Sequence, residues 1–114
     1  MAAPGAAEWP EPPSEFLADT AMVVGLLELE LFLPDAHSLK DKRSVLKSLK
    51  DQLHGRFNVA VTELHAGVKW QRAGLGLTTV ATDRASVDEC LRHVVQWIEG
   101  NRFVQVVRVQ REVL

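Results

Sequence analysis

The chain has 114 residues, of which 46% are hydrophobic and 25% are charged, and its formal net charge is −2 at pH 7. This length and composition are typical of one globular domain with one core. The single cysteine, Cys90, excludes an internal disulfide and a cysteine-based zinc site. The N-terminal stretch lacks the positive start and the apolar core typical of a signal peptide, and no apolar run is long enough to predict a transmembrane helix. These features favour a cytoplasmic protein.

Residues 1–21 differ in composition from the rest of the chain. They hold four of the five prolines, four acidic side chains and no lysine or arginine. Such a segment buries too little apolar surface to offset the entropy lost on ordering. We therefore predict a disordered extension over residues 1–21 and one domain over residues 22–114. That domain holds 13 basic and 11 acidic side chains, so it is mildly basic.

The first half of the domain predicts a strand, a helix and a second strand. Apolar and polar side chains alternate along residues 23–33, which is the period of a half-buried strand. Ser38 and Asp41 form an N-capping pattern for a helix that ends at Gly55. The apolar residues of this helix recur at helical spacing: Leu39, Val45, Leu46, Leu49 and Leu53. Residues 57–64 are predicted to form the second strand.

The second half predicts a strand, a helix and a last strand. A turn centred on Gly67 leads to a strand over residues 72–81. Asp83 is placed to cap a helix that Gly100 ends, and residues 102–113 form the final strand. The buried stripe predicted for this helix consists of Val87, Cys90, Leu91, Val94, Trp97 and Ile98.

The order strand, helix, strand, strand, helix, strand predicts a ferredoxin-like α+β fold. Its four-stranded antiparallel sheet carries both helices on one face and leaves the other face open. Gly74, Gly76 and Thr78 fall on one side of the third strand, where the glycines offer no side chain to cover a surface. We expect a homo-oligomer, most simply a two-fold dimer, that forms through this face or through the strand edges.

The first helix carries a stripe of positive charge roughly 80° wide at 100° per residue. The stripe consists of Lys40, Arg43, Lys47, Lys50 and His54. Like charges three or four residues apart repel by about 0.2–0.5 kcal/mol, and cations are unfavourable near a helix N-terminus. A polyanion would explain this arrangement, because it would neutralise the row. The alternative is a solvated face whose charges pair with acids such as Asp51 or with the acidic extension.

Three segments resemble the YlxP-like bacterial family, which is classed as a domain of unknown function: HSLKDKRSVLKSLKDQL, RFNVAVTEL and WQRAGLGL. The resemblance covers residues 22–114. It implies a small cytoplasmic protein with a ferredoxin-like fold, usually encoded beside genes for translation initiation and ribosome-binding factors. It implies no known reaction. The segment HAGVK at residues 65–69 departs from the family, whose members more often carry acidic residues there.

Little in the sequence points to catalysis. Acylphosphatases share this fold, bind phosphate in the first strand-helix loop with an arginine, and use a nearby asparagine to position water. The corresponding loop here lacks a glycine-rich cradle, and Asn58, the asparagine considered for that role, lies at a strand start. Cys90 belongs to the predicted core. The histidines show no metal-ligand spacing: His37, His54, His65 and His93. We expect no catalytic residue, no metal and no cofactor.

Trp70 and Arg72 lie at the entry to the third strand and are candidates for a partner contact. A tryptophan beside an arginine can stack a base or anchor a protein, although it can equally cover a sheet edge. The leading hypothesis is a non-enzymatic binding module, an RNA- or ribosome-associated accessory factor that uses the basic helix. The alternative is a homo-oligomeric protein-interaction module that acts through its open sheet face. A small enzyme that acts on a phosphate ligand ranks below both.

Overall fold

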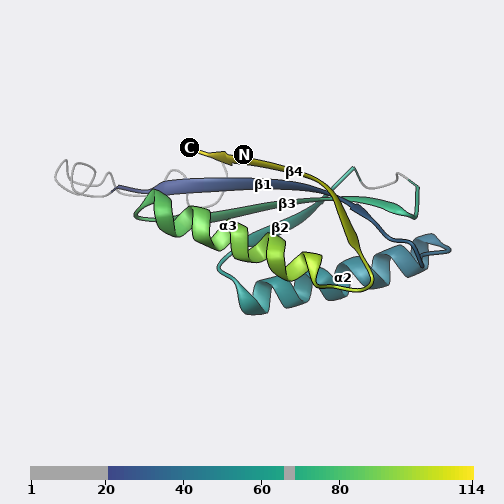
Figure 1. Ribbon diagram of the computed structural model, residues 1–114. Coiled ribbons are helices and arrows are strands. Elements are labelled where there is room, and N and C mark those ends of the chain that lie inside the picture. The colour runs from purple at the N-terminus through teal and green to yellow at the C-terminus, as the bar shows by residue number, and fades with distance from the viewer. Residues whose placement is uncertain (1–20, 66–68) are drawn as a thin grey trace, which may run out of the picture.

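The computed structural model describes residues 21–65 and 69–114, which form a four-stranded antiparallel sheet with two helices on one face (Figure 1). The elements in chain order are β1 (Val23–Phe32), α2 (Leu39–Arg56), β2 (Ala60–Leu64), β3 (Arg72–Ala81), α3 (Arg84–Glu99) and β4 (Gln105–Val113). The strands lie in the order β2-β3-β1-β4. The predicted ferredoxin-like α+β fold is therefore confirmed. Residues 1–20 of the predicted extension and the turn at Gly67 lie outside the described residues.

Two strands begin three residues later than predicted. The predicted second strand starts at residue 57, but β2 begins at Ala60, because the Val59 amide turns back to donate to the Phe57 carbonyl at 3.0 Å. The last strand was predicted from residue 102, but β4 begins at Gln105. There the Asn101 side chain accepts from the Phe103 amide at 2.8 Å and holds a turn.

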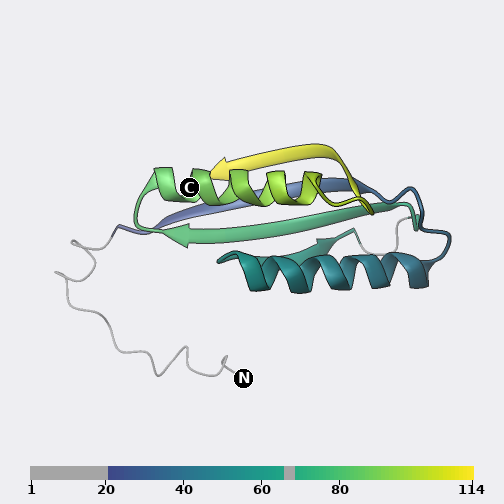
Figure 2. The same ribbon diagram turned by 60° about the horizontal axis from the view of Figure 1, so that its bottom comes forward.

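The core lies between the sheet and the helices. The sheet supplies one face of β1 and β3, whose buried leucines alternate with exposed or half-buried residues. α3 lies under β1, β3 and β4, and α2 lies along β2 (Figure 2). The largest side chains of the core are leucine, isoleucine and valine, at positions that include Leu27, Leu31, Leu75, Leu53 and Ile98.

Both helices begin at the residues that the capping pattern predicts. The Ser38 hydroxyl accepts from the Asp41 amide at 3.1 Å, and the Asp41 carboxylate accepts from the His37 amide at 3.0 Å. Asp83 accepts from the Ser86 amide at 2.7 Å and from its hydroxyl at 2.8 Å. These two hydrogen bonds stabilise the carboxylate, the amide contributing more, and lower the pKa of Asp83 below its ordinary value.

The first helix differs from its prediction in three details. α2 extends past Gly55 to Arg56, where the Phe57 amide donates to the Leu53 carbonyl at 3.0 Å and ends it. Leu39, predicted on the apolar face, is exposed, whereas Lys42 is only 3% exposed. The buried stripe consists of Lys42, Leu46, Leu49 and Leu53, residues spaced by four, three and four, so the lysine occupies a core-facing position of the helix.

Candidate functional site

The basic row predicted on α2 is present as an exposed surface. Lys40, Arg43, Lys47 and His54 are exposed, and Lys50 is half-buried. All five lie on one 18-residue helix, so their spacing is fixed by its geometry. We refer to Lys40, Arg43, Lys47, Lys50 and His54 as the basic row.

The charge of the domain is concentrated on this helix. α2 carries six basic and two acidic side chains, whereas the rest of residues 22–114 carries seven basic and nine acidic side chains. The helix therefore has a net charge of +4, and the remainder of the domain is net acidic. A local excess of one sign of charge attracts polyanions even when the overall charge is small.

One member of the basic row has an acidic partner. Lys47 Nζ lies 2.9 Å from Asp51 Oδ2, one turn further along the helix, and the two side chains are 79% and 65% exposed. Such an exposed pair contributes only about 0.3–0.5 kcal/mol. The predicted alternative, in which the row is neutralised by acids of the same domain, thus holds for Lys47. Among the described residues, Lys40 and Arg43 make no ion pair of this kind.

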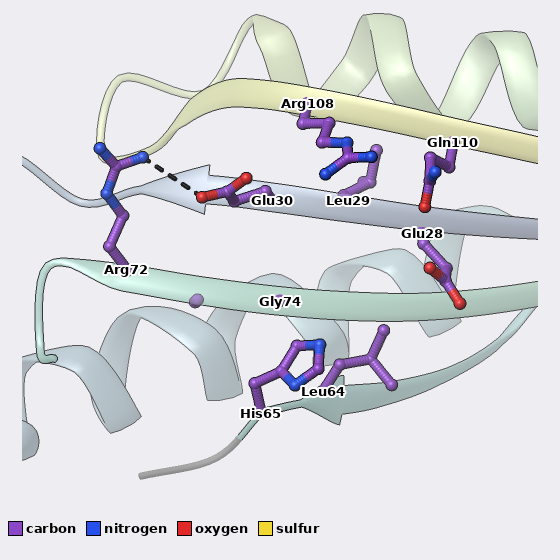
Figure 3. A pocket seen from close by; sticks show the side chains of 10 residues that line it. Glu28, Leu29, Glu30, Leu64, His65, Arg72, Gly74, Arg108 and Gln110 are labelled. Carbon is purple, nitrogen blue, oxygen red and sulfur yellow. Dashed lines mark hydrogen bonds and ion pairs between the residues drawn. The ribbon is translucent and has the colours of Figure 1, made fainter. Parts of the chain in front are cut away.

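A second candidate lies on the opposite, open face of the sheet. A hollow of about 220 Å³ sits above Gly74 of β3, and we call it the open-face pocket (Figure 3). Its polar side chains come from three strands and from the end of a fourth: Glu28, Glu30, His65, Arg72, Arg108 and Gln110. A more apolar hollow continues beside it over Gly76, between Leu26 and Leu64.

The charges of the open-face pocket largely satisfy one another. Arg72 Nη1 lies 3.5 Å from Glu30 Oε1, and its guanidinium stacks over the Phe32 ring at 5.3 Å. With the amide nitrogen of Gln110 turned toward Glu28, that side chain donates to Glu28 Oε2 at 3.2 Å and its oxygen accepts from an Arg108 nitrogen at 3.2 Å. The pocket is a polar hydrogen-bonded surface without a concentrated charge of one sign.

The floor of this pocket is Gly74, because the end of β2 lies too close to that position to leave space for a side chain. A Cβ on Gly74 would lie 3.1 Å from both the Cβ and the carbonyl oxygen of Leu64. His65 follows with φ of 57°, a left-handed conformation that non-glycine residues rarely adopt, and its ring lies over Gly74 (Figure 3). The bare surface expected at the glycines is therefore partly covered by Leu64 and His65.

The two residues predicted as a partner contact have different surroundings. Trp70 is 48% exposed, so part of its surface is available for a contact. Arg72 belongs to the wall of the open-face pocket and is held there by Glu30 and Phe32. Arg72 is thus placed on the sheet face away from the basic row.

The other residues considered for chemistry are not assembled into a site. Cys90 is half-buried against the core from α3, as expected. Asn58, weighed as a water-positioning residue, offers its backbone carbonyl to the Thr79 hydroxyl at 2.7 Å. In the described part of the chain, His, Cys, Asp and Glu side chains form no group of three or more that could hold a metal ion.

Within the same part, neither α2 nor α3 combines the length and apolar character of a membrane-crossing helix.

Sequence reasoning missed the pocket because it depends on strand register. The alternation of β1 places Glu28 and Glu30 on the open face, and the same period in β4 places Arg108 and Gln110 there. These signals were present in the sequence. The position of Leu64 opposite Gly74 depends instead on the pairing of β2 with β3, which the pattern of neither strand reveals.

Comparisons with known proteins find one solved structure with a weak structural likeness, one similar bacterial protein and one family model. A crystal structure of a C-terminal segment of the alpha subunit of aIF2 from Pyrococcus abyssi is 16% identical, with a TM-score of 0.42. The match covers 82% of this chain and 50% of that one. The uncharacterized protein YlxP of Bacillus subtilis (strain 168) is 34% identical over 78 residues, which are 68% of this chain and 85% of that protein. Residues 24–111 match the family model "Protein of unknown function (DUF503)". The chain therefore belongs to the DUF503 family, which confirms its resemblance to YlxP-like proteins.

Proposed function

We propose that the protein is a non-enzymatic, cytoplasmic binding module that associates with RNA or ribosomal particles through the basic row of α2. The observation that carries this proposal is the net charge of +4 on α2, whose exposed cations include Lys40, Arg43 and Lys47, in a domain whose remainder is net acidic. Phosphates along a nucleic-acid strand would neutralise the row and release counterions. The gene neighbourhood implied by the family resemblance, which concerns translation, supports the same class of partner.

Two exposed cations at the start of α2 support a contact with phosphates. Lys40 and Arg43 lie in the first turns of α2, are exposed, and make no ion pair with another described residue. Side chains of this kind contact phosphates and position a ligand without reading its sequence. RNA-recognition sheets stack bases on aromatic residues, but the central positions of the open face here are Gly74 and Gly76 of β3. The helix is thus the better candidate surface.

A second candidate function is protein interaction through the open sheet face. Leu26 and Val80 are 37% and 46% exposed there, and an apolar hollow lies beside Leu26. Exposed apolar residues that cluster beside polar ones are typical of a protein contact. The open face and the basic row lie on opposite sides of the sheet. A protein partner bound to the open face would therefore leave the basic row accessible.

The test is a charge-removal experiment on matched helices. In one variant Lys40→Gln and Arg43→Gln are combined, and in the control Arg84→Gln and Arg92→Gln remove two exposed arginines from α3. Affinity for two unrelated single-stranded RNAs is measured at several salt concentrations. The α2 variant is expected to lose affinity equally for both RNAs, and its salt slope should fall by about 0.7 per lost phosphate contact.

The α3 control is expected to retain both affinity and salt slope. Co-sedimentation with ribosomal particles at low salt, and release at higher salt, is the corresponding measurement for an assembled particle. Equal losses in the two variants would mean that the binding is general electrostatic attraction. Unchanged affinity in the α2 variant would overturn the proposal and favour the open-face alternative.

A further inference from the structure

Among the residues that the structure describes, the outer edge of β4 is unpaired, and the strand carries exposed valines. β4 pairs only with β1, so its other edge has no neighbour in the described part of the chain. Val107 and Val109 on this strand are 51% and 45% exposed. A free edge that carries exposed valines is a template for pairing with a further strand unless something blocks it.

The hydrogen bonding of β4 with β1 determines which backbone groups remain free. The Leu114 amide donates to the Val24 carbonyl directly opposite, at 2.8 Å. In an antiparallel ladder only alternate residues point their N–H and C=O groups at a given neighbour. The even-numbered residues from Arg108 to Leu114 therefore bond to β1. Val109, Arg111 and Val113 direct their backbone groups outward, to the free edge.

This alternation restricts how β4 can pair with a second β4 about a two-fold axis. In a hydrogen-bonded ladder of two β4 strands, the residues whose backbone groups point outward in one copy must lie opposite such residues in the other copy. The two-fold axis is therefore level with one residue, which lies opposite its own copy, and not level with the midpoint between two consecutive residues. An axis through Arg108, Arg111 or Glu112 would set identical charges directly opposite each other, which is destabilising. An axis through Val109 would set Arg108 against the neutral Gln110 of the partner.

An axis through Gln110 is the one that joins opposite charges. It places Arg108 opposite the partner's Glu112 and, by symmetry, Glu112 opposite the partner's Arg108. Both lie on the open face in non-hydrogen-bonded pairs, where cross-strand side chains come closest. Among the described residues neither Arg108 nor Glu112 makes an ion pair within its own chain, and Glu112 lies opposite Leu26 in the sheet.

We infer that two copies of the chain pair through the β4 edge in this register and form one continuous eight-stranded sheet. Val109 meets the partner's Arg111 in a hydrogen-bonded pair on the helix face, where the aliphatic part of the arginine covers the exposed valine. The ladder stops near Val107, because an irregularity between Glu30 and Leu31 makes Val107 the extra residue of β4.

This dimer has a consequence for the basic row. The two-fold axis of an antiparallel β4 pair runs perpendicular to the sheet, so the helices of both copies lie on the same side. α2 lies along β2, at the sheet edge away from β4, so the two basic rows occupy opposite ends of one surface. The dimer itself depends only on β4 and does not rest on the proposed RNA binding.

Charge reversal tests the register directly. Glu112→Arg sets two arginines opposite each other in each symmetric pair, and Arg108→Glu sets two glutamates there. The masses of the full chain and its variants are measured by light scattering and sedimentation over a range of micromolar concentrations. The wild type is expected to be a dimer, and each single reversal should raise its dissociation constant about tenfold or more.

The decisive samples restore the opposite charges. The double variant Arg108→Glu with Glu112→Arg should dimerise like the wild type, and an equimolar mixture of the two single variants should form heterodimers. Glu89→Arg on the exposed surface of α3 is the matched control and should leave the dimer unchanged. Circular dichroism of each single variant checks that it is folded.

Three results would overturn the inference. One is a monomeric wild type over the whole concentration range. Another is a dimer that both single reversals leave intact, which would place the contact on another surface such as the open face. The third is failure of the double variant and of the mixture to dimerise, because the register then does not pair Arg108 with Glu112.

Discussion

Gly25 of β1 and Val87 of α3 lie against each other with no space for a side chain between them. A Cβ built on Gly25 would overlap Val87 Cγ1 and would lie 3.0 Å from Leu91 Cδ1. Both α3 residues are fully buried. The missing side chain lets the first turns of α3 approach the sheet closely, which fixes where the helix crosses β1.

Gly25→Ala is therefore expected to destabilise the fold by overpacking, at a cost of about 1–3 kcal/mol. The free energy of unfolding from urea denaturation measures this cost. Gly76→Ala is the control within the same sheet. Its Cβ would meet the Leu64 side chain at 3.3 Å on the open face, where the leucine can rotate away. Equal losses in the two variants would show that strand propensity, and not the contact with Val87, causes the effect.

The N-terminus of α2 gives a second stability prediction. Ser38 accepts from the Asp41 amide at 3.1 Å, so Ser38→Ala leaves that amide without its partner and should cost about 1 kcal/mol. Ser44→Ala, at an exposed position inside the same helix, is expected to be neutral or slightly stabilising because alanine favours helix. A loss at Ser44 as large as that at Ser38 would contradict a capping role.

Asp83 predicts a specific pH dependence. Its pKa in the folded protein is lowered from the ordinary 3.8, first by the Ser86 amide and then by the Ser86 hydroxyl. A lowered pKa means that the folded state favours the charged carboxylate. Its contribution to stability is therefore present above pH 3.8 and is lost as the pH falls through the folded-state pKa.

Asp83→Asn isolates this charge, because asparagine caps a helix about as well as aspartate. The wild type is expected to melt at a higher temperature than the variant at neutral pH, and the difference should vanish in acid. NMR titration of the Asp83 carboxyl carbon gives the pKa directly, and Ser86→Ala should move it back toward the ordinary value. A melting difference that is constant with pH would contradict the assignment.

The fold could be predicted from sequence because its signals are local. The alternation of β1, the capping serine and aspartates, and Gly100 after α3 each report on a few neighbouring residues. The burial of Lys42 was not predicted, because the apolar set expected for this helix does not include a lysine, although the four-residue spacing from Lys42 to Leu46 places both on one face of the helix. Helical spacing defines a face of the helix and does not say how the sheet covers each of its residues.

The two candidate sites also differ in whether their residues are close together in the sequence. The basic row was predictable because one helix carries all of it. The open-face pocket brings Glu30 of β1, Arg72 of β3 and Arg108 of β4 together with His65 after β2, and such proximity follows from strand pairing. The segment HAGVK likewise contains no local signal that predicts the left-handed conformation of His65, apart from Gly67 two residues further on.

The ion pair between Lys47 and Asp51 makes the final prediction. The pair is exposed, and its atoms lie 2.9 Å apart on the surface that we propose for RNA. Asp51→Asn removes the acid that competes with phosphate for Lys47, so RNA affinity should rise about twofold to threefold and the salt slope should steepen. The free energy of unfolding should change by less than about 0.5 kcal/mol.

The matched control is Glu89→Gln, which removes one exposed acidic charge from α3. It changes the net charge of the chain by the same amount, so any general attraction of RNA is reproduced. Binding isotherms at low and moderate salt compare the three proteins. A gain confined to Asp51→Asn supports contact at Lys47, because only that substitution releases a cation of the basic row. A gain of equal size in both variants would mean that net charge alone governs the affinity, and a fall in affinity would show that Asp51 itself contacts the ligand.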